Sequence, residues 1–206
     1  MDDTVQTGPA KAEPSIETER AKYAEVWQSP AYRKACHGRH GLDLWRNHRD
    51  MFPPNPSSVL DIGCGTGRLF AHLRDNGINA KAIDLVDGMD PEIRARYGAH
   101  FTATAIQDLR ELGRRFELGM CIDVMEHLPE TAIDAALQVI DAVTDTAVFL
   151  IANHVSQHMG ADLDLTQRPP EWWQARLQTV FAHVERLPYV RQRWNDPDVV
   201  FLFRCN

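Results

Sequence analysis

Cysteine is scarce in this sequence, and no two cysteines have the C-x-x-C spacing of a redox or zinc motif. The four residues, Cys36, Cys64, Cys121 and Cys205, are widely separated. A disulfide-stabilised fold is therefore not expected. We predict free thiols in a reducing compartment, and hence a cytoplasmic protein.

Long apolar runs and an excess of positive charge are also missing. No segment approaches the roughly 18 apolar residues of a membrane span, and the acidic start Met-Asp-Asp is unlike a signal peptide. The 22 lysines and arginines are outnumbered by 29 acidic residues, for a net charge of −7. This balance disfavours a nucleic-acid-binding face. We expect a small-molecule partner and no membrane contact; the composition leaves the oligomeric state open.

The chain is long enough for one domain. Its 206 residues are 44% hydrophobic, which suffices for one sizeable core. Residues 1–15 are small and polar and are expected to form a disordered tail. Residues 16–206 are predicted to be a single domain, with helices over 16–52 followed by a core over 57–206.

A glycine-rich turn organises that core. Val59, Leu60 and Ile62 predict a buried strand, and three glycines, at positions 63, 65 and 67, follow it before a helix begins near Arg68. Glycine lets the backbone turn sharply and approach a ligand closely. A strand, a glycine turn and a helix together indicate a nucleotide-binding site.

Two phosphate-binding motifs are absent from this turn. A dinucleotide fingerprint starting at Gly63 would need glycine where Arg68 stands, and a P-loop would need Gly-Lys-Ser/Thr where the chain has Arg68-Leu69-Phe70. The turn therefore favours a ligand whose phosphates are not the main contact.

The segment from Val59 to Leu69 resembles the first motif of class I S-adenosylmethionine (SAM) dependent methyltransferases, and Ala80 to Leu85 resembles their second. The resemblance covers roughly residues 55 to 155. It implies an α/β fold: a Rossmann-like, doubly wound sheet of seven strands in the order 3-2-1-4-5-7-6, with the last strand antiparallel and with N-terminal lid helices. It also implies SAM as the cofactor.

The same resemblance implies a set of cofactor-binding residues. An acidic residue that ends strand 2 holds the ribose hydroxyls in this family, and residues after strand 3 approach the adenine, where backbone groups, Gln107 and Asp108 are the alternatives. Lid helices fold over the pocket. The expected cofactor residues are Asp61, Gly63, Cys64, Gly65, Gly67, Asp84, Leu85, Gln107, Asp108, Cys121, Tyr23, Trp27, Tyr32 and Arg33.

Polar residues follow strands 4 and 5 and are candidates for catalysis. His154 is the first choice for a general base, followed by His158 and His127, with Glu126 beside His127. Asp123, Glu126 and His127 would share one face of a helix beginning at Asp123, in a D-x-x-E-H pattern similar to the E-x-x-E-H of metal-assisted ubiquinone-pathway O-methyltransferases. A divalent metal at these three residues is one hypothesis; Asp123 as a helix cap, without metal, is the other.

The acceptor pocket is expected from the lid and from the segment after strand 5. Its predicted substrate-binding residues are His37, His154, His158, Arg168 and Trp172. The sequence favours methyl transfer to a small-molecule acceptor, with an oxygen nucleophile as the specific hypothesis. The alternatives are a nucleotide- or nucleic-acid-modifying methyltransferase and a SAM-binding protein without catalysis.

Overall fold

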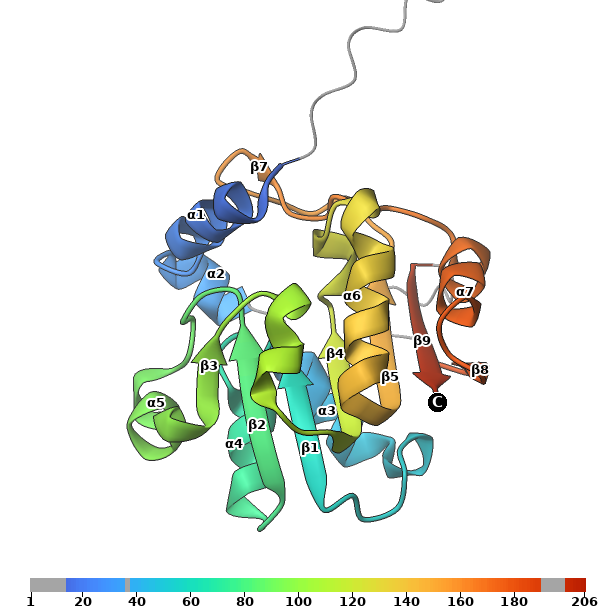
Figure 1. Cartoon of the computed structure of the whole chain (residues 1–206). Helices are drawn as coiled ribbons and strands as arrows, with labels where there is room; N and C mark the ends of the chain where they lie inside the picture. The colour runs from blue at the N-terminus through green and yellow to red at the C-terminus, as the bar shows by residue number, and fades with distance from the viewer. Residues whose placement is uncertain (1–13, 36–37, 190–198) are drawn as a thin grey trace, which may run out of the picture.

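The computed structural model describes residues 14–35, 38–189 and 199–206. It is built on a seven-stranded sheet in the order β3-β2-β1-β4-β5-β9-β8, in which β9 runs antiparallel to both of its neighbours (Figure 1). The strands of this sheet are β1 (Ser58–Ile62), β2 (Asn79–Asp84), β3 (Phe101–Ala103), β4 (Phe116–Ile122), β5 (Thr144–Ala152), β8 (Val184–Leu187) and β9 (Val200–Cys205).

The predicted α/β fold is confirmed. The strand numbers at one edge differ from the prediction because a two-stranded hairpin, β6 (Gln157–His158) with β7 (Ala161–Asp162), precedes the last two strands of the main sheet. Counted within the main sheet alone, the last strand lies between the fifth and sixth strands, as expected.

Helices cover both faces of the sheet. In Figure 1, α6 lies in front of β4 and β5, whereas α3 and α4 lie behind the sheet, and α1 crosses above the ends of the strands next to β7. The α-helices are α1 (Ile16–Val26), α2 (Pro30–Ala35), α3 (Gly38–Asn47), α4 (Arg68–Asp75), α5 (Pro91–Tyr97), α6 (Glu130–Val143) and α7 (Pro170–Gln178); short 3-10 helices are η1 (Arg49–Met51), η2 (Gly98–His100), η3 (Ile106–Leu112) and η4 (Met125–His127).

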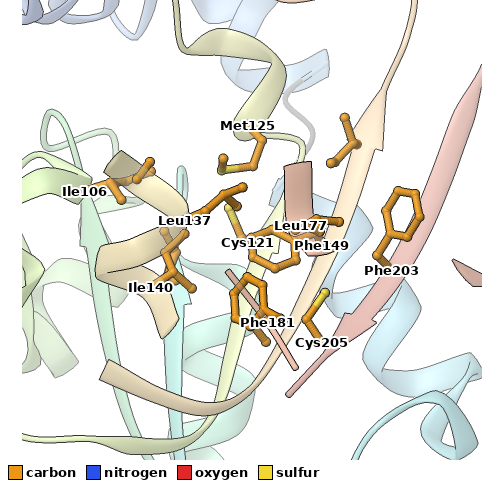
Figure 2. Close-up of a cluster of buried hydrophobic side chains, with 14 of the residues drawn as sticks. Ile106, Cys121, Met125, Leu137, Ile140, Phe149, Leu177, Phe181, Phe203 and Cys205 are labelled. Carbon is orange, nitrogen blue, oxygen red and sulfur yellow. The ribbon is translucent and has the colours of Figure 1, made fainter. Parts of the chain in front are cut away.

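The central strands are buried on both sides. Along β5, Phe149 and Ile151 point into one hydrophobic cluster, and Val148 and Leu150 point into the cluster on the opposite face. This alternation follows from the two-residue period of a strand, and strands covered on both faces have continuous apolar sequences. Figure 2 shows the first cluster, in which side chains from α6, α7 and β9 surround Cys121 and Phe149.

The N-terminal boundary of the domain differs slightly from the prediction. Ser15, assigned to the tail, caps α1 through its side chain, which accepts a hydrogen bond from the backbone N–H of Thr18. The rest of the expected tail, residues 1–13, lies outside the described residues. In the described part of the chain, no helix is long and apolar enough to cross a bilayer.

Candidate cofactor and active site

The turn after β1 is fixed between two neighbouring strands. Gly63 and Gly65 have φ angles of +71° and +54°, which side-chain-bearing residues rarely adopt. The N–H of Gly63 donates to the carbonyl of Ile83 in β2 at 2.9 Å. On the other side, a Cβ at Gly63 would lie only 2.3 Å from Cγ2 of Val124. Both the backbone conformation and the available space therefore require glycine.

Asp84, at the end of β2, lies beside this turn. One oxygen of its carboxylate accepts a hydrogen bond from the N–H of Gly65 at 2.8 Å. Burial raises the pKa of Asp84 to about 6, although hydrogen bonds from Gly65 and neighbouring backbone N–H groups oppose the shift. The carboxylate is ionised at neutral pH and faces the same space as the glycine turn.

That space is a cavity of about 390 Å³ at the carboxyl edge of the sheet, within the size range of small-molecule sites. The ends of β1, β2 and β4, the loop after β3, the start of α6 and helix α1 all contribute walls. The lining residues are Pro14, Ser15, Ile16, Glu19, Tyr23, Trp27, Tyr32, Gly63, Gly65, Ile83, Asp84, Leu85, Thr104, Ala105, Ile106, Gln107, Ile122, Asp123, Val124, His127, Leu128, Pro129, Thr131 and Ala132.

Eight of the predicted cofactor residues therefore lie on one cavity wall or another: Tyr23, Trp27, Tyr32, Gly63, Gly65, Asp84, Leu85 and Gln107. They come from the lid, the glycine turn, the end of β2 and the loop after β3. The structure thus brings together residues that are up to 84 positions apart in the numbering, from Tyr23 to Gln107.

Four other predicted cofactor residues lie next to the glycine turn and the neighbouring strands but do not line the cavity. Asp61 is buried, and its carboxylate accepts a hydrogen bond from the N–H of Phe70 in the first turn of α4; burial raises its pKa to about 7. Gly67 is the N-cap of α4. The thiols of Cys64 and Cys121 are buried, and burial raises the pKa of both. None of these four lines the cavity.

Two more expected cofactor contacts point elsewhere. Asp108 is exposed and does not line the cavity. Of the three alternatives for the adenine contact, the loop backbone and Gln107 therefore remain. Arg33 donates to the carbonyls of Gly88 and Met89 and pairs with Asp90 at 3.0 Å. Arg33 therefore fastens α2 to the loop after β2.

The hypothesis that Asp123, Glu126 and His127 share one helical face is wrong. Asp123 has a φ of +54°, residues 125–127 form only a short 3-10 helix, and α6 begins at Glu130. The three side chains have different partners: Asp123 lies 2.5 Å from Nδ1 of His40, whereas Glu126 and His127 turn towards other groups. Among the described residues, no group of three His, Cys, Asp or Glu side chains is arranged to hold a metal ion.

Glu126 is a buried acid. It is 1% exposed, and its Oε1 accepts a hydrogen bond from the N–H of Ala152 at the end of β5. Burial raises its pKa to about 8. The hydrogen bond from Ala152 connects Glu126, and with it η4, to the end of β5.

His127 lines the cavity and is held from behind. Its Nδ1 lies 3.0 Å from a carboxylate oxygen of Asp164 and 3.1 Å from the carbonyl oxygen of Leu163. Burial alone would lower the pKa of His127, but the hydrogen bond to Asp164, the nearby charges and the Leu163 carbonyl together raise it to about 9. An imidazolium cannot accept a proton, so His127 does not suit the predicted role of base.

His154 faces a smaller, neighbouring space. This water-sized cavity of about 10 Å³ shares Tyr32, Asp123 and His127 with the large one. His154 lines it, with Nδ1 3.3 Å from the second carboxylate oxygen of Asp164. The first-choice base therefore lies beside the large cavity but not on its wall.

The remaining substrate residues are dispersed. His158 packs against the ring of Tyr32 at 5.1 Å. Arg168 forms an exposed ion pair with Glu130, and Trp172 packs edge-on against its neighbour Trp173. None of the three lines either cavity, and His37 lies outside the described residues.

The sequence reasoning missed two residues of the site. His40, in α3, contacts Asp123 at the cavity, and Asp164 holds His127. Both belong to segments without a recognisable motif, and both are brought to the site from distant parts of the chain. The only signal for Asp164 was its place a few residues after His154 and His158 in the sequence.

Comparison with known proteins agrees with this geometry. Residues 32–194 match the family model described as a methyltransferase domain. Magnesium protoporphyrin IX methyltransferase of Arabidopsis thaliana is 26% identical over 98 residues, covering 45% of this chain and 31% of that protein. Malonyl-[acyl-carrier protein] O-methyltransferase of Pseudescherichia vulneris is 38% identical over 64 residues, 31% of this chain and 26% of that protein.

Solved structures share the fold over nearly the whole chain. The magnesium protoporphyrin IX methyltransferase of Synechocystis PCC 6803, crystallised with bound SAM, superimposes with a TM-score of 0.61 at 15% identity, covering 94% of this chain and 98% of that one. A Burkholderia thailandensis N-methyltransferase bound to its substrate and S-adenosylhomocysteine gives 0.52 at 22% identity, covering 97% and 94%.

The fold and the cavity define a class I methyltransferase architecture, and the match over most of the chain identifies the family. The chain belongs to the methyltransferase-domain family. It matches about a third or less of the length of the two curated relatives.

Proposed function

We propose that this protein is a SAM-dependent methyltransferase whose 390 Å³ cavity holds the cofactor and opens towards a small-molecule acceptor. The observation that carries the proposal is the convergence of the glycine turn, Asp84 and the loop after β3 on this one cavity.

The residues present fit SAM. The carboxylate of Asp84 can accept hydrogen bonds from a ribose diol, and Gly63 and Gly65 leave the backbone bare for close approach. The apolar side chains of Leu85 and Ile106 lie on the cavity wall where a flat adenine could pack. Bound SAM would supply a methyl group on a sulfonium, a leaving group that is already activated.

The protein's own contribution is then to orient the acceptor and exclude water. Helix α1 carries Tyr23, whose ring lies 5.8 Å from that of His127, and both residues line the cavity. The buried hydroxyl of Tyr23 has no hydrogen-bond partner among the described residues. Burial foremost, and nearby acidic groups, raise the pKa of Tyr23 well above its usual value, so the phenol remains a donor.

These two donors favour an oxygen acceptor that is already anionic at neutral pH, such as a carboxylate or an acidic phenol. Among the described residues, the neighbours of Nδ1 of His127 are acceptors, which fixes a proton there, and the raised pKa of His127 keeps a second proton on Nε2. A hydroxyl and an imidazolium can together hold an oxyanion. An ionised oxygen needs no general base before it attacks the methyl group.

We also propose that residues 16–52 act as a lid over the cavity, within a single domain spanning 16–206. Arg20 of α1 donates to the carbonyl of Leu85 at 2.5 Å, and Lys22 donates to the carbonyl of Asp162 at 3.0 Å. Helix α1 is thus attached on both sides of the opening. Deletion of residues 1–13 should leave cofactor affinity unchanged, whereas deletion to residue 35 should weaken it.

Calorimetry tests the cofactor first. The intact protein should bind SAM and S-adenosylhomocysteine, and Asp84→Ala should weaken both by about 1–3 kcal/mol because the ribose hydroxyls lose their acceptor. Absence of SAM binding, or tighter binding of NAD, would contradict the proposal.

Turnover then tests the acceptor. Release of S-adenosylhomocysteine should be measured against carboxylic acids, phenols, amines and nucleosides under the same conditions. We expect turnover with an acidic oxygen compound and its loss in Tyr23→Phe. Preferential methylation of amines, undiminished in Tyr23→Phe, would overturn the choice of oxygen.

A further inference from the structure

The segment that follows β7 is hydrogen-bonded to η4 at several points. The N–H groups of Leu165 and Thr166 both donate to the carbonyl of Glu126, at 2.8 and 2.9 Å. The hydroxyl of Thr166 donates to the carbonyl of Leu128 at 2.7 Å. Together with the contact between His127 and Leu163, these bonds fix residues 163–166 against residues 126–128.

Asp164 lies at the centre of this attachment. It is only 5% exposed, and its two carboxylate oxygens are directed at different imidazoles. One oxygen is 3.0 Å from Nδ1 of His127, and the other is 3.3 Å from Nδ1 of His154. A buried carboxylate placed between two histidines loses hydration, and the charge-assisted contact with imidazole offsets that loss.

We propose that Asp164 is a positioning residue of the active site: it fixes the proton on Nδ1 of His127 and the orientation of the ring, so that Nε2–H is presented to the acceptor cavity. Nδ1 of His154 lies 3.3 Å from the other oxygen of the same carboxylate, on the opposite side from His127. The catalytic consequence rests on the proposed function, whereas the geometry of the two histidines does not.

Several other groups act on His127 and must be considered with Asp164. Glu126 is its chain neighbour, Tyr23 approaches from α1, and Asp84 interacts electrostatically with it from β2. Asp123, at the end of β4, and His154 border the same small cavity. Compared with these residues, Asp164 is the carboxylate that contacts the His127 ring at ion-pair distance. Its removal should therefore have the largest effect on the pKa and orientation of that ring.

The substitution Asp164→Asn separates charge from shape. The amide has the size of the carboxylate and retains one oxygen that can accept from Nδ1, but it has no negative charge to stabilise an imidazolium. Asp162→Asn is the matched control, because Asp162 is an exposed residue two positions earlier, in β7, whose side chain contacts Gln157 rather than a histidine.

Histidine titration followed by ¹⁵N NMR tests the proposal without any acceptor. In the wild-type protein His127 should carry protons on both nitrogens at pH 8. In Asp164→Asn its titration midpoint should fall by about one pH unit or more. Asp162→Asn should match the wild type. A His127 that titrates in the wild type at or below the ordinary value of about 6.5 overturns the proposal, even if the Asn variant fails to fold.

Kinetics provide the second test. Asp164→Asn should lower kcat by about ten- to a hundredfold and shift the alkaline limit of the pH profile to lower pH, with the affinity for S-adenosylhomocysteine unchanged. Equal losses of cofactor affinity and turnover would indicate a merely structural role and overturn the proposal. If the wild type methylates no acceptor, the proposed function fails, while the NMR measurement still decides the role of Asp164.

Discussion

The indole ring of Trp27 lies against the backbone of Gly88: a Cβ atom at Gly88 would be 2.5 Å from Cδ2 of Trp27. Trp27 is 9% exposed and also packs edge-on against Tyr32 at 5.0 Å. Both aromatic residues line the cavity. The close packing of the lid on the loop after β2 therefore requires a residue without a side chain at position 88, as glycine provides.

Gly88→Ala should consequently displace the lid. The added methyl group cannot fit beneath the rigid indole ring of Trp27. The backbone φ angle of Gly88 does not oppose the substitution. We expect about a tenfold loss of S-adenosylhomocysteine affinity and faster proteolysis within residues 16–35, with little change in the sheet. Gly98→Ala is the control, since a Cβ there meets only the flexible end of Arg94. Unchanged affinity in Gly88→Ala would contradict a closed lid.

Cofactor binding should depend on the ionisation of Asp84. Burial raises its pKa to about 6, so the carboxyl group gains a proton as the pH falls through 6. A protonated carboxyl is a poorer acceptor for ribose hydroxyls, and the affinity for S-adenosylhomocysteine should decline from pH 7 to pH 5. Calorimetry should show this decline in the wild type and a weak, nearly pH-independent affinity in Asp84→Asn. A flat wild-type profile would argue against contact with the ribose.

Stability should fall between pH 6.5 and pH 9. The folded protein retains the His127 proton up to about pH 9, whereas the unfolded chain releases it near 6.5, so this contribution is fully present below 6.5 and is lost as the pH rises through 9. Urea unfolding should show about 1–3 kcal/mol more loss across this interval in the wild type than in His127→Asn. Parallel pH profiles for the two proteins would contradict the raised pKa.

In both proteins, the wild type and His127→Asn, the free energy of unfolding should still decrease somewhat as the pH rises. The buried carboxyls of Asp61 and Glu126 have pKa values raised to about 7 and about 8, so the fold resists their ionisation and loses stability as the pH rises towards those values. Because Glu126 and His127 interact electrostatically, the comparison between wild type and variant reports on the histidine together with its effect on the pKa of Glu126.

Turnover should survive chelators. Asp123 contacts His40, Glu126 accepts from Ala152 and His127 is held by Asp164, so each of these side chains already has a partner in the protein, although all three border the small cavity. EDTA should therefore leave the rate within about twofold. Glu126→Gln, which replaces a buried neutral acid by a neutral amide, should behave like the wild type. Loss of activity in EDTA that Mg²⁺ restores would contradict this prediction.

Local sequence patterns were enough to predict the sheet and the cofactor side of the cavity. The buried strand predicted from Val59, Leu60 and Ile62 is β1, and the helix predicted to begin near Arg68 is α4, which begins at Arg68. The turn at Gly63 and the acidic residue at position 84 also lie where the motifs placed them. These features were accessible because hydrophobic periodicity and glycine spacing depend on residues close together in the chain.

The acceptor side of the cavity depends on contacts between segments that are far apart in the chain. Asp123 follows β4 in a left-handed conformation, and α6 starts only seven residues later, at Glu130. Helical spacing therefore does not apply to Asp123, Glu126 and His127. Asp164 reaches His127 from a loop 37 positions further along the chain, and its hydrogen bond and charge help to raise the pKa of His127. Contacts between distant segments and the loss of hydration on burial have no local signature in the sequence, so the partners and charges at this end of the cavity became visible only in the folded chain.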